Sequence, residues 1–182
     1  MDEPPMDTAM TTLQINGYVP SRLDPRRAAE LRPEVEHFNI EYCAVLDSGQ
    51  VEDWPRFFTE DCISRITARE NAQLGLPVGL VYAEGRMMLQ DRAVAIARTQ
   101  MFAPRTMVHI LGPARVLAEE GTDILAQCNF ILLQTLVEGP TTLHLAGTYY
   151  DRLRRTAEGL LLQERQVIYE SSIIANDLVY PV

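Results

Sequence analysis

The chain has 182 residues, enough for one domain with a sizeable buried core, and its net charge is -9. Its composition, 47% hydrophobic and 23% charged, is typical of a globular protein and excludes disorder over the whole length. The negative charge and a pI of about 4.8 oppose binding to nucleic acid or to anionic membranes. All 16 basic residues are arginine, which excludes chemistry that needs a lysine, such as Schiff-base formation.

The start of the chain is acidic and has no apolar segment, so it does not resemble a secretory signal. The longest apolar run without a charge, residues 124–137, is shorter than the roughly 20 residues that span a bilayer. We therefore expect a cytoplasmic protein. Its cysteines, Cys43, Cys62 and Cys128, stand among apolar neighbours, which predicts buried and reduced thiols.

Residues 1–23 contain prolines and a glycine with little periodicity, which predicts an extended or disordered N-terminal arm. Residues 24–182 are expected to form a single domain. Asp24 and Pro25 are typical of a helix N-cap and first helical position. Pro33 is expected to interrupt this helix, because proline removes a backbone donor.

Beyond that proline, apolar residues recur every three or four positions from Val35 to Leu46, which predicts an amphipathic helix ending near Gly49. Residues 51–58 are expected to form a short helix, residues 62–67 a strand and residues 71–79 turns. Residues 86–99 are predicted to form a third helix. Its core-facing residues are expected to be Met88, Leu89, Ala93 and Ile96.

The second half of the chain is dominated by long β-patterned segments separated by short turn sequences. The predicted strands are residues 107–118, 122–137, 141–156 and 160–171. Gly112-Pro113 is expected to produce a bulge or bend in the first of them. About three helices followed by a meander of long strands predict an α+β fold, with the helices on one face of a curved, mainly antiparallel sheet.

Several short motifs occur in the order found in one protein family. They are Trp54 to Cys62, Arg69-Glu70-Asn71 with Gly75-Leu76-Pro77, Met88 to Arg92, Glu158-Gly159-Leu160 and Val179-Tyr180-Pro181. On these motifs, residues 34–182 resemble the small (beta) subunits of bacterial aromatic-ring-hydroxylating dioxygenases. The details look most similar to the small subunits of salicylate 5-hydroxylase, terephthalate dioxygenase and anthranilate dioxygenase.

This resemblance implies a cone-shaped, cystatin-like fold, also described as nuclear-transport-factor-like, and a mainly structural role. It implies a large alpha subunit as partner, with three alpha and three beta chains in the assembly, and self-association of the beta chains as a trimer. The alpha subunit would carry a Rieske 2Fe-2S cluster and a mononuclear Fe(II), receive electrons derived from NADH, and hydroxylate an aromatic, carboxylated substrate.

The residues themselves also favour cofactors on the partner chain and not on this one. A Rieske cluster needs Cys-x-His and Cys-x-x-His pairs, and no cysteine of this chain has a histidine at either spacing. A mononuclear iron site needs two histidines and a carboxylate on one face, whereas His37, His109 and His144 fall on separate predicted elements. We therefore expect no metal, no cofactor and no catalytic residue on this chain.

An enzymatic alternative stays open, because the implied cone fold is shared by ketosteroid isomerase and scytalone dehydratase. His109 shares a predicted strand face with Met107 and Leu111. Together with Tyr42 and Tyr149 it could form a proton-transfer pocket of a stand-alone isomerase or dehydratase. Apolar surroundings more often indicate a core histidine and core tyrosines with satisfied hydrogen bonds, so packing is the favoured interpretation.

The remaining candidates concern a subunit interface. Trp54 and Phe57 are three residues apart and are expected to pack into the core, with Phe58 pointing elsewhere. Arg152 and Arg154 lie near a predicted strand end and suit carboxylate pairing. Core packing and solvated surface are the ordinary alternatives; we take Trp54, Phe58, Arg152 and Arg154 as candidate interface residues.

Overall fold

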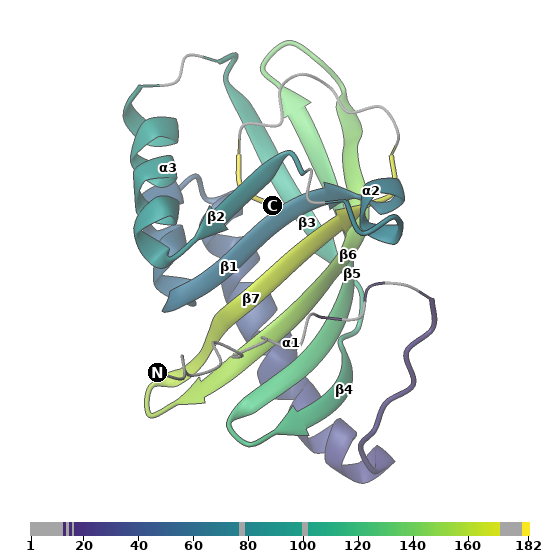
Figure 1. Ribbon diagram of the computed structural model, residues 1–182. Helices are drawn as coiled ribbons and strands as arrows, with labels where there is room; N and C mark the ends of the chain where they lie inside the picture. Colours follow the sequence, from purple (N-terminus) through teal and green to yellow (C-terminus); the bar gives the residue numbers. More distant parts are fainter. Residues whose placement is uncertain (1–12, 14, 16, 77–78, 100–101, 172–179) are drawn as a thin grey trace, which may run out of the picture.

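The computed structural model describes residues 13, 15, 17–76, 79–99, 102–171 and 180–182. Helices dominate its first half and strands its second half (Figure 1). The elements are α1 (Pro25–Asp47), the 3₁₀ helix η1 (Val51–Phe57), β1 (Phe58–Ala68), α2 (Arg69–Gln73), β2 (Val81–Glu84), α3 (Arg86–Arg98), β3 (Arg105–Leu111), β4 (Arg115–Glu120), β5 (Asp123–Leu136), β6 (Thr141–Thr156) and β7 (Gly159–Tyr169).

The seven strands form one curved sheet in the order β2-β1-β7-β6-β5-β3, and β4 also pairs with β5 (Figure 1). All neighbouring strands are antiparallel except β1 and β7, which are parallel. Parallel strands need a long connection, and here the connection is nearly the whole chain from α2 to β6. The β1–β7 pairing therefore joins residues far apart in the sequence, which no local pattern indicates.

Helix α1 crosses one face of the sheet, in contact with β3 and β4 (Figure 1). Asp24 is its N-cap and accepts a hydrogen bond from the backbone N–H of Arg26 at 2.9 Å. The predicted interruption at Pro33 was wrong, because the helix continues through this proline. Pro33 lies on the exposed side, and burial of Leu31 and Val35 on either side of it offsets the lost backbone bond.

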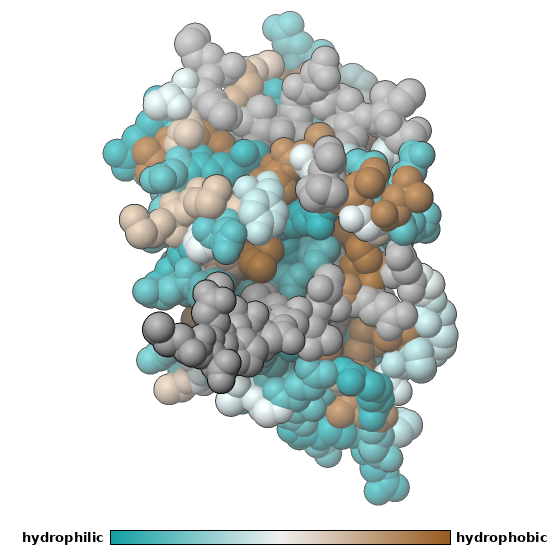
Figure 2. Space-filling view, viewed as in Figure 1, coloured by the Kyte–Doolittle hydropathy of each residue, from teal (hydrophilic) through white to brown (hydrophobic). Residues whose placement is uncertain are grey.

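The N-terminal end of α1 projects from the lower edge of the molecule and presents a hydrophilic surface (Figure 2). Ion pairs hold this end of the helix against β4 and the end of β6. Arg27 contacts Glu119 at 2.7 Å, and Arg155 contacts Glu34 at 2.7 Å. These pairs are partly exposed, so solvent screens them and each adds little stability.

Helix α3 packs against η1 and β1. Of the residues predicted to face the core, Leu89, Ala93 and Ile96 are buried, which confirms three of the four. Met88 is exposed instead, and its sulfur lies 3.4 Å from the backbone nitrogen of Glu84. It flanks β2, a four-residue strand that was not predicted from the sequence.

The predicted strand over residues 107–118 is divided into β3 and β4, which pair with successive parts of β5. The division falls at Gly112-Pro113, where a bend was expected. Gly112 still donates its N–H to Asn129 at 2.8 Å, and Ala114 donates to the Glu36 carboxylate of α1 at 3.0 Å. A side chain of the helix therefore replaces a strand partner at this bend.

Part of the predicted N-terminal arm can be placed. Residues 1–12, 14 and 16 lie outside the described residues. Leu13 is buried against Ala72, Tyr150 and Ile168, in a small apolar cluster separate from the main core. Residues 18–20 have no regular secondary structure, in keeping with an extended segment.

Candidate functional site

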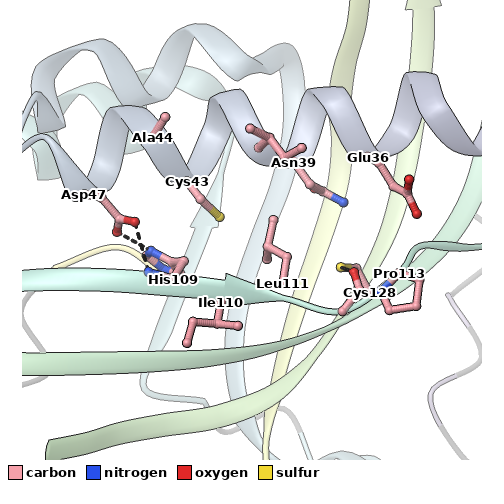
Figure 3. Close-up of a pocket in the computed structure, with 12 residues that line it drawn as sticks. Glu36, Asn39, Cys43, Ala44, Asp47, His109, Ile110, Leu111, Pro113 and Cys128 are labelled. Carbon is pink, nitrogen blue, oxygen red and sulfur yellow. Dashed lines mark hydrogen bonds and ion pairs between the residues drawn. The ribbon is translucent and has the colours of Figure 1, made fainter.

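A groove of about 650 Å³ lies between α1 and the β3 end of the sheet. Helix α1 contributes one face, with Glu36, Asn39, Cys43 and Asp47 spaced so that they line the same side. Strand β3 contributes His109 and Leu111, and Figure 3 shows the side chains from the two elements facing each other across the groove. The volume is within the range of small-molecule sites in proteins.

His109 and Asp47 form a hydrogen-bonded pair at one end of the groove (Figure 3). The Nδ1 atom of His109 lies 2.6 Å from one carboxylate oxygen of Asp47. The backbone N–H of His109 donates to the other oxygen at 2.9 Å. Both oxygens thus hold the same residue, which fixes the imidazole ring and places the proton of the neutral ring on Nδ1.

Arg165 of β7 lies at the centre of the molecule with no exposed surface. Its guanidinium makes two hydrogen bonds to Asp151, at 2.8 and 2.7 Å, and one to the Asn39 side-chain oxygen at 2.5 Å. The rings of Tyr42 and Tyr149 each lie 4.2 Å from its central carbon. This buried cation is thus neutralised by one carboxylate and held by two ring faces.

The two tyrosines have different hydroxyl environments. The hydroxyl of Tyr42 accepts a hydrogen bond from the Trp54 indole at 2.8 Å and donates one to the Val182 carbonyl at 3.1 Å. The hydroxyl of Tyr149 is buried beside the Cys43 thiol and makes no hydrogen bond of ordinary geometry among the described residues. The satisfied core tyrosine that we predicted is therefore correct for Tyr42 alone.

Burial controls the protonation of these groups. It raises the pKa of Tyr42 to about 12 and moves the pKa of Tyr149 well above its usual value. It also raises the pKa of the Cys43 thiol to about 12 and that of Cys128 to about 11. All four groups hold their protons near neutral pH, so the thiols do not act as nucleophiles there. The prediction of buried thiols is confirmed for Cys43, Cys62 and Cys128.

The structure separates the three residues of the enzymatic alternative. Tyr42 and Tyr149 meet on either side of Arg165, whereas His109 pairs with Asp47 and lines the groove. Neither tyrosine is among the residues that line this groove. The fold therefore does not bring these three side chains together in a single pocket.

The four candidate interface residues lie at different depths. Trp54 and Phe58 are buried and pack edge to face, with ring centroids 5.6 Å apart, so the expectation that Phe58 points away from the core was wrong. It begins β1, whose first side chain faces inward. Arg152 is buried and lies 3.5 Å from Asp123, while Arg154 is partly exposed and lies 3.0 Å from the same carboxylate.

Four residues of this region were not predicted from the sequence: Asp47, Asn39, Asp151 and Arg165. Asp47 is 62 residues from His109, and Asn39 is 126 residues from Arg165, so no spacing rule connects them. One signal was available: Gln163-Glu164-Arg165-Gln166 is a polar run inside an otherwise apolar strand. A polar run at such a position indicates side chains with buried partners.

Two observations bear on cofactors and membranes. Within the described ranges, no group of three or more His, Cys, Asp or Glu side chains is placed to hold a metal ion. None of the helices described is both long and apolar enough to cross a membrane.

Comparison with known proteins identifies the family. Residues 43–176 match the family model described as ring hydroxylating beta subunit. The chain belongs to this family. The recognition made from the sequence motifs is thereby confirmed.

Similar beta subunits are known from several bacteria. The chain is 34% identical to the small subunit of anthranilate 1,2-dioxygenase from Burkholderia cepacia, over 82% of this chain and 92% of that protein. It is 31% identical to the beta 1 subunit of the terephthalate 1,2-dioxygenase terminal oxygenase component from Comamonas sp, over 82% and 97% of the two chains.

A solved structure of a beta subunit assigned to an aromatic-ring-hydroxylating dioxygenase of Novosphingobium aromaticivorans is also similar. It is 31% identical, with a TM-score of 0.78, and the match covers 86% of this chain and 99% of that one. The predicted α+β cone fold, with N-terminal helices on a curved sheet of long strands, is confirmed by the structure and by this likeness.

Proposed function

We propose that this beta subunit is a non-catalytic, structural component of a terminal oxygenase, which supports the assembly of Rieske-type alpha subunits. The match to anthranilate and terephthalate dioxygenase small subunits along nearly their whole length carries this proposal. The names of these two relatives also support an aromatic, carboxylated substrate for the assembled oxygenase.

The chemistry of the interior agrees with a structural role. Arg165 and Asp151 neutralise each other, and burial keeps Tyr42 and Cys43 protonated. These groups stabilise the fold through hydrogen bonds and ring contacts, and they are not poised to exchange protons near neutral pH. The reaction would therefore be carried out on the partner subunit.

The proposal places the Rieske 2Fe-2S cluster and the mononuclear Fe(II) on the alpha chain. It also includes an assembly of three alpha and three beta subunits, beta chains that contact one another as a trimer, and a cytoplasmic location. Contacts of this kind in obligate assemblies bury about 2,000 Å² or more.

The interface prediction can now be narrowed. Trp54, Phe58 and Arg152 are buried inside the subunit, so their side chains offer little surface to a partner. Arg154 has 35% of its side chain exposed and lies 3.8 Å from Asp61, itself well exposed. Arg154 is therefore the interface candidate that we retain.

The direct test is co-expression with a large (alpha) subunit of a ring-hydroxylating oxygenase. Size-exclusion chromatography with mass determination and an absorption spectrum of the eluted peak would follow. We expect one complex of both chains, with Rieske absorption that is lost when the large subunit is omitted. Failure of a folded large subunit to bind this chain would overturn the proposal.

Arg154→Ala tests the narrowed interface. We expect weaker association with the large subunit or with other beta chains, measured as a shift toward smaller species at equal concentration. Arg98→Ala is the matched control, because Arg98 pairs with Glu52 on an exposed surface of α3. Equal behaviour of the two variants would remove Arg154 from the interface.

A second candidate function, the stand-alone isomerase or dehydratase, is favoured by one observation: a carboxylate orients His109 beside a groove. The separation of Tyr42 and Tyr149 from that groove opposes it. His109→Ala distinguishes the two functions. The structural proposal expects unchanged oxygenase turnover per assembled complex, whereas an isomerase or dehydratase would be inactive although folded.

A further inference from the structure

His109 has an unsatisfied hydrogen-bonding atom inside the protein. Its side chain is only 1% exposed, and its Nε2 atom has no hydrogen-bond partner among the described protein atoms. Because Nδ1–H of the neutral ring donates to Asp47, Nε2 keeps a lone pair and needs a donor. Buried polar atoms are nearly always paired, so this atom requires a partner from outside the described chain.

A second unpaired atom belongs to the same groove. The Asn39 side-chain oxygen accepts from Arg165, while its nitrogen is buried without a partner. Figure 3 shows the Asn39 side chain extending from α1 into the space above β3. Asn39 and Asp47 are eight residues apart on one helix, which corresponds to about 12 Å along its axis. The groove therefore offers an acceptor near one end and a donor farther along it.

Apolar side chains form much of the remaining surface. Leu111 and Pro113 lie along the strand side, and the exposed side chain of Ile40 belongs to the helix side. The length and the apolar walls suit a flat molecule of about two rings. Since Nε2 is shielded from solvent in this conformation, the ligand reaches it when side chains of the wall shift.

Charge in the groove selects against anions. Glu36 and Asp47 place two carboxylates on the helix side, and no arginine is among the described residues that line this cavity. The nearby cation, Arg165, is already bound by Asp151 and Asn39. A carboxylate ligand would meet negative charge without compensation, so a neutral ligand fits better.

We propose that the groove between α1 and β3 is a small-molecule site of the beta subunit, which binds a neutral aromatic compound through a hydroxyl group donated to His109. In this site Asp47 is a positioning residue, because it fixes the tautomer that makes Nε2 an acceptor. The Asn39 amide is available to an acceptor atom of the same ligand. The site does not depend on the alpha subunit, so its test is independent of the assembly proposal.

The test uses calorimetric titration of the full chain with three related probes: 2-naphthol, 2-methoxynaphthalene and 2-naphthoate. We expect saturable binding of 2-naphthol at one site. 2-Methoxynaphthalene has no hydroxyl proton to donate, so it should bind about five- to tenfold more weakly, as expected for the loss of one hydrogen bond. The anion 2-naphthoate should bind more weakly than 2-naphthol. Absence of 2-naphthol binding, or a preference for the anion, would overturn the proposal.

Two variants test the roles of the pair. His109→Phe keeps an aromatic ring but removes Nε2, so the preference for 2-naphthol over its methyl ether should disappear. Val108→Ala is the control, because Val108 is exposed and the neighbouring position on a strand faces the other way. Circular dichroism confirms that each variant is folded.

Asp47→Asn gives a test that retains the side-chain shape. The backbone N–H of His109 requires the amide oxygen, which turns the amide NH₂ toward Nδ1. Nε2 then carries the proton and becomes a donor, so 2-methoxynaphthalene should bind as well as 2-naphthol. An unchanged preference in this variant would show that Asp47 does not set the recognition.

Selective ¹⁵N-histidine NMR provides a readout that does not depend on affinity. We expect the His109 signal to show the Nδ1–H tautomer and its Nε2 resonance to shift on addition of 2-naphthol. The signals of His37 and His144 serve as internal controls. The His109 signal is assigned by its absence from the spectrum of His109→Phe. A shift confined to the other two histidines would place the ligand elsewhere and refute the site.

Discussion

Asp151→Asn is the substitution for which the structure makes the sharpest prediction. It removes one negative charge from the centre of the subunit and leaves the size of the side chain nearly unchanged. Asp151 and Arg165 are both fully buried, and two hydrogen bonds of 2.8 and 2.7 Å join them. The substitution leaves Arg165 as a buried cation without a counter-charge.

We expect a large loss of stability. Breaking a buried ion pair by removing one partner costs about 3–5 kcal/mol. A domain of this size has a total unfolding free energy of about 5–15 kcal/mol, so the variant should be close to unfolding. The Asn39 hydrogen bond and the two ring contacts remain, and they hold the guanidinium in position without neutralising it.

The measurement is urea denaturation at neutral pH, followed by circular dichroism and by the fluorescence of Trp54, the single tryptophan. Glu52→Gln is the matched control, since it breaks a carboxylate–arginine pair of the same chemistry at the surface. Exposed pairs contribute about 0.2–1 kcal/mol, so the control should change stability little.

A double replacement separates the charge from the packing. Asp151→Leu combined with Arg165→Met removes both charges, and it should be at least about 2 kcal/mol less destabilising than the sum of the single changes. The reasoning fails if Asp151→Asn costs no more than the surface control, or if the single effects simply add.

Three further changes test other parts of the fold. Gly147→Ala should lower stability by about 1–3 kcal/mol in urea denaturation, because its Cβ would lie 2.3 Å from the Ile168 carbonyl oxygen. Tyr42→Phe should cost about 1–3 kcal/mol and alter the fluorescence of Trp54, whose indole would lose its acceptor. Glu164→Gln should stabilise the chain near neutral pH, because burial raises the pKa of Glu164 in the folded state. The folded chain then binds the proton more tightly than the unfolded chain, so the advantage of Glu164→Gln should vanish as pH falls from the folded to the unfolded pKa.

Each of these changes has a control in the same chain. Gly139→Ala meets no atom closer than 3.6 Å, and Tyr82→Phe alters an exposed hydroxyl. Glu158→Gln removes an exposed carboxylate. If these controls lose as much stability as the test variants, burial is not the cause. A pH-independent effect of Glu164→Gln would contradict the raised pKa of Glu164.

Local patterns predicted several elements closely. The helix expected over residues 86–99 is α3 (Arg86–Arg98), and the strand expected over residues 141–156 is β6. Helical and strand periodicities arise from side chains that share one face, and such faces are encoded by near neighbours in the sequence. The same reasoning placed His109 on one strand face with Leu111, and both residues line the groove.

Two predictions were wrong because tertiary contacts override the local preference of the chain. Pro33 disfavours a helix, yet burial of Leu31 and Val35 against the rest of the fold carries α1 through it. Phe58 was assigned outward from helical spacing, but the chain changes to β1 at this residue and the side-chain direction changes with it. At both positions tertiary packing, and not intrinsic propensity, decides which secondary structure forms.

The sequence by itself determined the family, the α+β class and most of the elements, because motif order and periodicity are properties of short segments. Only the tertiary structure decided which residues meet: the parallel pairing of β1 with β7, the pair of Asp47 with His109, and the enclosure of Arg165 by Asp151 and two tyrosines. The physical reason is that a buried charge or an oriented imidazole depends on atoms brought together when α1 packs on the sheet, across separations of up to 126 residues.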